Sequence, residues 1–298
     1  MINMYPLLID GGLSNQLEKQ GHDLNHKLWS AKLLESEPEA IIKAHLAYLE
    51  AGAQCITTAS YQATIPGFIS IGYDMVTAES LIKKSVHLAE RAIKRFYIKG
   101  SKPLIAASIG PYGAYLADGS EYHGNYGISE ETLREFHEYR IRLLDQSNAD
   151  ILACETIPSF KETIVLANLL KDINKQTWIS FACKDEFHIN DGTPIEDCVD
   201  ILSDHPNIFA IGVNCTSPKY ISGLVKAIKP KIKNKRIIVY PNSGDVYNAE
   251  TKVWSELSSS EQLLNQAKKW INQGVDIIGG CCRIGPEEIK SLRKLIKV

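Results

Sequence analysis

The sequence predicts an α/β fold in which eight parallel strands and their helices close into one (β/α)8 TIM barrel. The chain of 298 residues contains eight short apolar runs rich in β-branched residues, and between them the apolar residues take helical spacing. An open doubly wound sheet is the main alternative, but it usually carries a glycine-rich phosphate turn after its first strand. Asp10-Gly11-Gly12 does not match that turn. The barrel is therefore preferred, with residues 1–298 as a single domain.

The apolar runs bound the expected strands. They are Leu7–Ile9, Cys55–Thr58, Leu104–Ala107, Ile151–Ala153, Trp178–Ala182, Ile208–Val213, Ile237–Tyr240 and Val275–Ile278. Between them, the apolar residues change to the spacing of one helix face. The clearest stripes are Leu81, Ile82, Val86, Ala89, Ile93 and Phe96, and Leu133, Phe136, Leu143 and Leu144.

Helix boundaries are marked by capping residues. Four pairs have capping-box spacing: Ser36–Glu39, Ser159–Glu162, Thr193–Glu196 and Ser258–Glu261. Pro194 and Pro218 occupy the place of a first helical residue, and Gly52 and Gly274 follow helical stretches as left-handed caps. Two βα connections are long, roughly 11–36 after strand one and 109–128 after strand three. Long loops at this face of a barrel often form lids or binding loops.

Composition excludes several classes of protein. Lys plus Arg is 33 and Asp plus Glu is 35, a net charge of −2, without a clustered basic face. Nucleic acid is therefore not an expected partner. No apolar run approaches the roughly 18 residues of a membrane helix, and the N-terminus lacks a basic signal-peptide region. We expect a cytoplasmic enzyme or binding protein; oligomeric state is not disclosed.

The seven cysteines indicate a metal site rather than disulfides. Cys281 and Cys282 are adjacent, and their Cα atoms, about 3.8 Å apart, are too close for an unstrained bridge. They follow the eighth strand, and Cys215 follows the sixth. Three thiolates at one end of the barrel would make a soft site suited to Zn²⁺ with its fourth position open. The other four, Cys55, Cys154, Cys183 and Cys198, are expected to be packing residues.

Further polar residues follow other strands at the same end of the barrel. They are Asp10, Thr57, Tyr61, Glu155 and Asn214. Asp10-Gly11-Gly12 could equally be a simple turn, and Glu155 could equally be a solvated carboxylate.

GVNC at 212–215 and GGCC at 279–282 resemble the zinc motifs of the homocysteine S-methyltransferase family. The resemblance extends over nearly the whole chain. IDGGLSNQLEKQG at 9–21, ITTASYQAT at 56–64 and ETIP at 155–158 are similar to the first, second and fourth strand ends of that family. The stretches LWSAKLL at 28–34 and ASYQAT at 59–64 look most like its short branch, which uses S-methylmethionine and to some degree S-adenosylmethionine.

The resemblance implies a homocysteine-binding domain with Cys215, Cys281 and Cys282 as zinc ligands. It implies that Asp10 and Glu155 hold the homocysteine ammonium, and that Thr57 and the amides near Gly11 contact its carboxylate. Asn214 belongs to the zinc motif and is expected near the substrate. Trp29 and Tyr61 are implied on the side of the methyl donor.

The implied reaction is methyl transfer from a sulfonium to the homocysteine thiol, giving methionine. Another donor, or selenohomocysteine as acceptor, stays an alternative. Two rival interpretations are a barrel with structural zinc and no methyl transfer, and a metal-free lyase or isomerase using Glu155.

Overall fold

The computed structural model describes residues 6–96, 100–244, 246–248, 253–255 and 260–296. Eight parallel strands form one sheet in the order β1-β10-β7-β6-β5-β4-β3-β2. A parallel bridge between Ile9 and Cys55 joins the two edge strands and closes the barrel. The strands are β1 (Leu7–Leu8), β2 (Cys55–Thr57), β3 (Leu104–Ile109), β4 (Ile151–Ile157), β5 (Thr177–Phe181), β6 (Ile208–Asn214), β7 (Arg236–Tyr240) and β10 (Ile277–Ile278). The predicted TIM barrel is confirmed.

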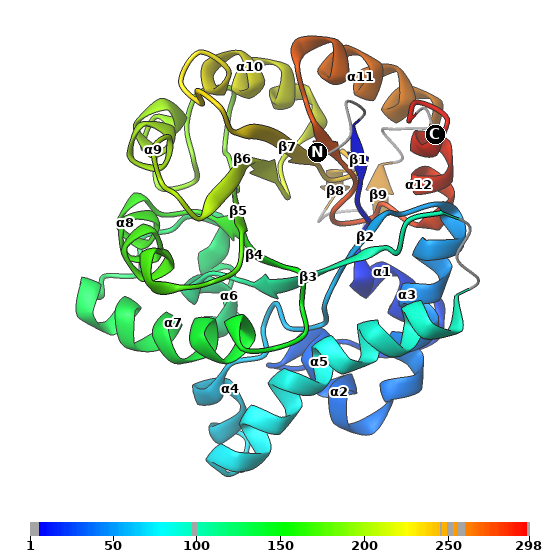
Figure 1. Ribbon diagram of the computed structural model, residues 1–298, viewed down its shortest axis with the longest axis vertical. Helices are drawn as coiled ribbons and strands as arrows, with labels where there is room; N and C mark the ends of the chain where they lie inside the picture. The colour runs from blue at the N-terminus through cyan, green and yellow to red at the C-terminus, as the bar shows by residue number, and fades with distance from the viewer. Residues whose placement is uncertain (1–5, 97–99, 245, 249–252, 256–259, 297–298) are drawn as a thin grey trace.

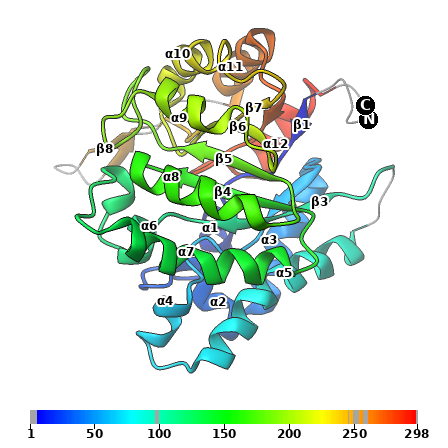
Figure 2. The ribbon, with the colours of Figure 1, turned by 60° about the vertical axis from the view of Figure 1, so that its left-hand side comes forward.

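A ring of helices covers the outside of the sheet (Figure 1). Within the described residues, one long helix follows each strand of the barrel. They are α3 (Pro38–Ala51), α5 (Met75–Arg95), α7 (Glu130–Asp145), α8 (Phe160–Leu169), α9 (Ile195–Leu202), α10 (Pro218–Ile228), α11 (Ser260–Gln273) and α12 (Pro286–Arg293). In Figure 2, α7 and α8 lie against the outside of the sheet beside β4. No described helix combines the length and apolar character that a membrane crossing needs.

Two apolar clusters hold these layers together. The larger lies between the sheet and the helices and contains most of both predicted stripes, with Leu81, Ile82 and Val86 from α5 and Leu133 from α7. Phe136 is not part of it, and its ring packs against Tyr112 instead. The smaller cluster includes Ile9, Ala106, Trp178, Ile238 and Ile277, which come from different strands and fill the inside of the barrel. The four cysteines expected as packing residues are buried: Cys55, Cys154, Cys183 and Cys198. Apolar burial of this extent is the main force that stabilises such a domain.

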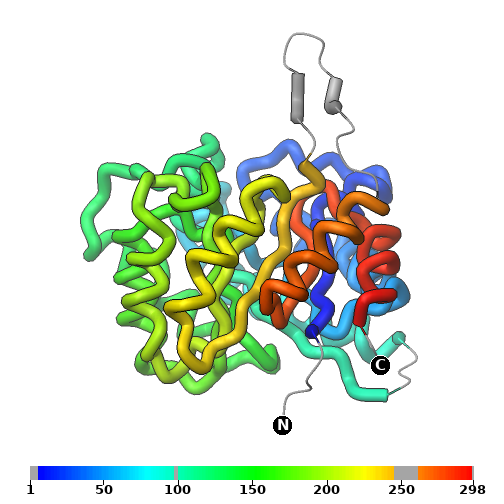
Figure 3. The backbone as a smooth tube through the Cα atoms, turned by 90° about the horizontal axis from the view of Figure 1, so that it is seen from above, coloured from blue at the N-terminus to red at the C-terminus, as the bar shows by residue number. Residues whose placement is uncertain are grey.

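The short elements lie in the βα connections. The predicted long loops after β1 and β3 contain α1 (Leu13–Lys19), η1 (Trp29–Lys32) and α2 (Leu33–Ser36), and α6 (Tyr112–Leu116) and η2 (Ser120–Tyr122). Other short elements are α4 (Ile65–Ile69) and η3 (Leu170–Asp172). An antiparallel strand pair, β8 (Val246–Asn248) and β9 (Val253–Ser255), lies outside the barrel sheet, and the sequence pattern did not predict this pair. In Figure 3 the first described residues lie at one face, and the dark blue segment after β1 runs over the opposite face.

Four helix boundaries follow the prediction. Ser159 caps α8 by accepting a hydrogen bond from the Glu162 amide, and Pro218 is the first residue of α10. Gly52 and Gly274 have φ of 103° and 108° and follow α3 and α11, as expected for left-handed caps.

Two predicted caps are wrong. Ser36 ends α2, and α3 begins at Pro38 after Glu37 because proline's fixed φ favours the first helical position. Thr193 lies one residue too early to cap α9, which begins at Ile195. The prediction of Pro194 as the first helical residue is wrong as well, because its ψ of 134° is extended and it stands at the N-cap position. Ser258 lies outside the described residues.

Candidate metal and substrate site

The three predicted ligand cysteines meet at the carboxyl end of the barrel. Cys215 follows β6, and Cys281 and Cys282 follow β10. Their three Sγ atoms lie within 4.8 Å of one another, and those of Cys215 and Cys282 are 3.7 Å apart. Hydrogen bonds from Cys215 and Cys281 lower the pKa of the Cys282 thiol. Their spacing is that of a group that can enclose one cation.

Backbone contacts fix these cysteines. The Cys215 amide donates to the Tyr240 carbonyl at 3.3 Å, and the Cys281 amide donates to the Pro241 carbonyl at 2.8 Å. Cys215 has a left-handed φ of 47°, a conformation that costs energy in a residue with a side chain. Both cysteine segments are thus anchored to the end of β7 and the loop after it, and the strained turn directs Cys215 into the group.

Close packing explains why glycine is needed at Gly11 in the turn after β1 and at Gly280 in the GGCC segment. A Cβ on Gly11 would lie 2.3 Å from the Ile284 carbonyl oxygen, and one on Gly280 would lie 2.0 Å from Cγ2 of the same residue. Only glycine allows the turn after β1 to approach Ile284 this closely, and only glycine allows the segment after β10 to fold so tightly between Gly280 and Ile284. This contact brings Asp10 and Cys281 to one cavity.

A cavity of about 430 Å³ opens beside the cysteine sulfurs. Its walls contain nine residues that the sequence pointed to: Asp10, Gly11, Trp29, Thr57, Tyr61, Glu155, Cys215, Cys281 and Cys282. Asn214 does not line the cavity. It is fully buried, and its amide accepts from the Thr156 backbone N–H at 2.7 Å and donates to the Thr156 hydroxyl at 2.8 Å. Asn214 thereby holds Thr156 at a left-handed φ of 62°.

Two buried carboxylates face the cavity from opposite sides of the barrel. Asp10 accepts hydrogen bonds from the amide of Thr57 at 2.8 Å and from its hydroxyl at 3.1 Å, and burial raises the pKa of Asp10. Glu155 accepts a hydrogen bond from Ser108, and burial together with the charge of Cys282 raises the pKa of Glu155 to about 7. Desolvated carboxylates such as these favour a cationic ligand.

The aromatic wall of the cavity comes from the loops after β1 and β2. The rings of Trp29 and Tyr61 contact each other edge to face, with centroids 5.9 Å apart. Tyr122 also lines the cavity, and the sequence pointed to a tyrosine within 112–126 without saying which one. The sequence pattern did not single out Ser108, Tyr240 and Glu121, which line the cavity as well. Tyr240 ends a predicted strand, and Ser108 directly follows the predicted strand Leu104–Ala107 and belongs to the observed β3, so the inward direction of both side chains could have been found. Glu121 and Tyr122 lie in a loop without a regular pattern.

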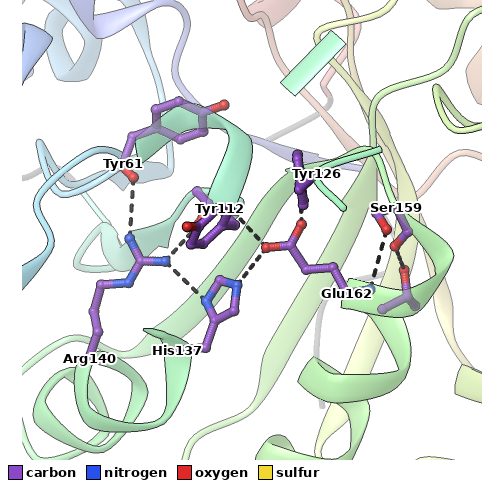
Figure 4. A network of polar contacts seen from close by, with 9 residues as sticks. Tyr61, Tyr112, Tyr126, His137, Arg140, Ser159 and Glu162 are labelled. Atoms are coloured by element: carbon purple, nitrogen blue, oxygen red, sulfur yellow. Dashed lines mark hydrogen bonds and ion pairs between the residues drawn. The ribbon is translucent and has the colours of Figure 1, made fainter. Parts of the chain in front are cut away.

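A buried polar network supports the loops around the cavity (Figure 4). Arg140 on α7 donates to the Gly110 carbonyl at 2.6 Å and to His137 Nδ1 at 3.2 Å. Because Nδ1 accepts, the proton of neutral His137 lies on Nε2, which donates to Glu162 at 2.6 Å. Glu162 also accepts from the amide of Tyr112 and the hydroxyl of Tyr126. The network thus ties α7 and α8 to the long loop after β3.

Comparison with known proteins shows which sequences and structures this chain is similar to. The family model described as "Homocysteine S-methyltransferase" matches residues 7–296. The Homocysteine S-methyltransferase YbgG of Bacillus subtilis is 47% identical over 98% of this chain and 95% of its own. The Selenocysteine Se-methyltransferase of Brassica oleracea is 44% identical over 96% and 88%. The metallated crystal structure of the Homocysteine Methyltransferase MmuM from Escherichia coli aligns with a TM-score of 0.87 and 40% identity, covering 97% and 96% of the two chains.

Proposed function

Because this chain belongs to the homocysteine S-methyltransferase family, we propose that it transfers a methyl group from S-methylmethionine, with S-adenosylmethionine as a lesser donor, to L-homocysteine. The product is methionine. The observation that carries this proposal is the group of three cysteine sulfurs within 4.8 Å of one another, beside a cavity with two buried carboxylates. We propose that residues 1–298 form one homocysteine-binding domain.

The residues fit a zinc ion. Three thiolates suit Zn²⁺ in both charge and softness, and the cavity beside them leaves space for a fourth ligand. Bound there, the ion would lower the pKa of the homocysteine thiol, which is near about 8.5 when free, so that a nucleophilic thiolate exists at neutral pH. Cys215, Cys281 and Cys282 are the proposed ligands, and Asn214 holds the backbone of the strained turn at Thr156 beside them.

Asp10 and Glu155 are proposed to hold the ammonium of homocysteine. Each carboxylate is already oriented by a protein hydrogen-bond donor, Thr57 for Asp10 and Ser108 for Glu155. Ordered acceptors of this kind need no rearrangement when the ammonium binds. The turn at Gly11 is proposed to contact the substrate carboxylate. Thr57 is proposed to contact it as well, which requires its hydroxyl to turn from Asp10 to the substrate while its amide keeps the bond to Asp10.

Trp29 and Tyr61 are proposed to face the sulfonium of the donor, because aromatic ring faces attract cations. In the reaction, a lone pair of the homocysteine sulfur forms the new S–C bond. The bond between the methyl carbon and the sulfonium breaks, and its electron pair stays on a neutral thioether. The thiol proton is lost to solvent. The leaving group needs no proton, so no residue is required as general acid, and alignment of the two sulfurs supplies much of the acceleration.

The relative named as a selenocysteine methyltransferase supports one second acceptor class, selenols such as selenohomocysteine. We also propose a cytoplasmic location, since all seven cysteines are free and the proposed ligands require a reducing compartment.

The experiment is methionine formation from homocysteine and methyl-labelled S-methylmethionine, with zinc-loaded protein under reducing conditions. Labelled methionine that forms only with homocysteine present supports the reaction and the donor together. No turnover with zinc still bound would overturn the donor assignment. No turnover and no bound metal would contradict the cysteine site, and full activity after chelation would favour the metal-free rival.

A further inference from the structure

The charges around the cavity are unbalanced. Three carboxylates line it, Asp10, Glu155 and Glu121, together with the three thiols. Among the described residues that line the cavity there is no lysine or arginine, and His26 uses Nδ1 to accept a hydrogen bond from the Leu28 amide. Buried negative groups are stable only with compensating positive charge or hydrogen-bond donors. Cationic groups must therefore come with the ligands.

Glu121 differs from the other two carboxylates. Asp10 and Glu155 are each held by a hydrogen-bond donor of the protein. Oxygen Oε2 of Glu121 is buried and has no hydrogen-bond partner among the described residues. A buried acceptor without a partner is destabilising, so such a group on a residue that lines a ligand cavity indicates a partner supplied by the ligand.

The backbone of Glu121 is held in place. Its carbonyl accepts from the side-chain amide of Asn190 at 3.1 Å. Before it, the Ser120 amide donates to Asp118, and after it the Gly124 amide donates to the Ser120 carbonyl. Gly113 packs so closely that a Cβ there would lie 2.5 Å from the Glu121 nitrogen. Glu121 therefore lines the cavity from an ordered turn.

We propose that Glu121 binds the α-ammonium group of the amino-acid methyl donor. The proposed function assigns the homocysteine ammonium to Asp10 and Glu155, and this inference rests on that assignment. A sulfonium has no N–H to donate and suits the rings of Trp29 and Tyr61. The donor's ammonium has three N–H donors and matches the unpartnered oxygen of Glu121. Glu121 then determines specificity for sulfonium donors that are amino acids.

The test compares S-methylmethionine with its des-amino analogue, 4-dimethylsulfoniobutanoate, in the zinc-loaded enzyme. Wild type is expected to prefer S-methylmethionine about tenfold to a hundredfold in kcat/KM, the effect of one charged hydrogen bond. Glu121→Gln is expected to lose most of that preference, with the KM for homocysteine and the zinc content unchanged. Equal use of the two donors by wild type would overturn the proposal without any variant.

Two control variants establish whether the effect belongs to Glu121 and to the donor end of the cavity. Glu131→Gln removes an exposed carboxylate on α7 and is expected to behave as wild type. Asp10→Asn is expected to raise the KM for homocysteine and to keep the donor preference. If Glu121→Gln instead raises only the KM for homocysteine, Glu121 belongs to the acceptor end and the proposal is wrong.

Calorimetric binding of the two sulfonium compounds to wild type and Glu121→Gln gives a readout without turnover. Selective binding of S-methylmethionine that Glu121→Gln abolishes supports the inference even if methyl transfer fails. Equal binding of both compounds by wild type overturns the inference even if methyl transfer succeeds.

Discussion

Two buried polar regions of this barrel manage charge in opposite ways. The network of Arg140, His137 and Glu162 contains its own cation, a carboxylate and a neutral histidine that connects them. The cavity contains carboxylates and thiols, and no lysine or arginine among its described lining residues. Burial lowers the pKa of Arg140 to about 10, so it still carries its charge at neutral pH. A region that is balanced internally supports the fold, and a region that needs outside cations binds ligands.

Cys282→Ala is expected to have the largest effect, and this effect is on ligand binding at the cavity. Removing one of three sulfurs should abolish stable zinc binding and reduce methyl transfer by about a thousandfold or more, because the metal supplies several kcal/mol of activation. Metal analysis and the turnover assay measure this. Cys198→Ala, which removes a buried packing cysteine of α9, should keep both zinc and activity. Full zinc in Cys282→Ala would remove that residue from the ligand set.

Arg140→Met is expected to lower the stability of the fold, because Arg140 is the cation of the balanced network. It leaves Glu162 buried without the cation and the Gly110 carbonyl without its donor, which should cost about 3–5 kcal/mol of unfolding free energy. Urea denaturation measures this. The matched control is Arg142→Met on the same helix, because Arg142 is exposed and its ion pair with Glu138 lies at the surface. That change should stay within about 0.5 kcal/mol. Equal destabilisation by both would show that the network adds no particular stability.

His45 is a third kind of buried polar group. It has no hydrogen-bond partner among the described residues and does not line the cavity. Both ring nitrogens lack hydrogen-bond partners among the described residues, and burial lowers its pKa to about 4. The unfolded chain takes up a proton below about pH 6.5, while the folded chain resists until about pH 4. Stability is therefore fully present above about pH 6.5 and falls by roughly 3 kcal/mol toward pH 4.

His45→Leu should remove that part of the acid sensitivity. The measurement is the urea midpoint of both proteins at about pH 7, where neither state is protonated at His45, and at about pH 4.5, inside the window in which only the unfolded chain is protonated. An equally steep loss of stability in the variant would contradict a neutral buried His45.

Trp29→Leu should give the smallest effect. Loss of one cation–π contact is expected to raise the KM for the sulfonium donor by about twofold to thirtyfold, equivalent to about 0.5–2 kcal/mol. Zinc content and the KM for homocysteine should not change. Donor titrations at saturating homocysteine measure this. An unchanged donor KM would exclude Trp29 from the donor pocket.

The parts of the site that the sequence predicted are those tied to strand ends. Cys215, Cys281 and Cys282 could be brought together because parallel strands of a barrel end at one face. The role of Asn214 could not be predicted, because the same residue type at the same strand end could equally point to substrate or to Thr156. Glu121 lies in a loop, where no periodicity states which side chain turns inward. The network of Arg140, His137 and Glu162 depends on contacts between distant elements, which local patterns do not reveal.

The central claim is that the cysteine group accepts the thiol of homocysteine beside it. X-ray absorption of the zinc-loaded protein, with and without homocysteine, tests this most directly. We predict that the sulfur ligands of the metal rise from three to four when homocysteine is added. A coordination shell that stays at three sulfurs while methionine forms would contradict thiol activation at this site.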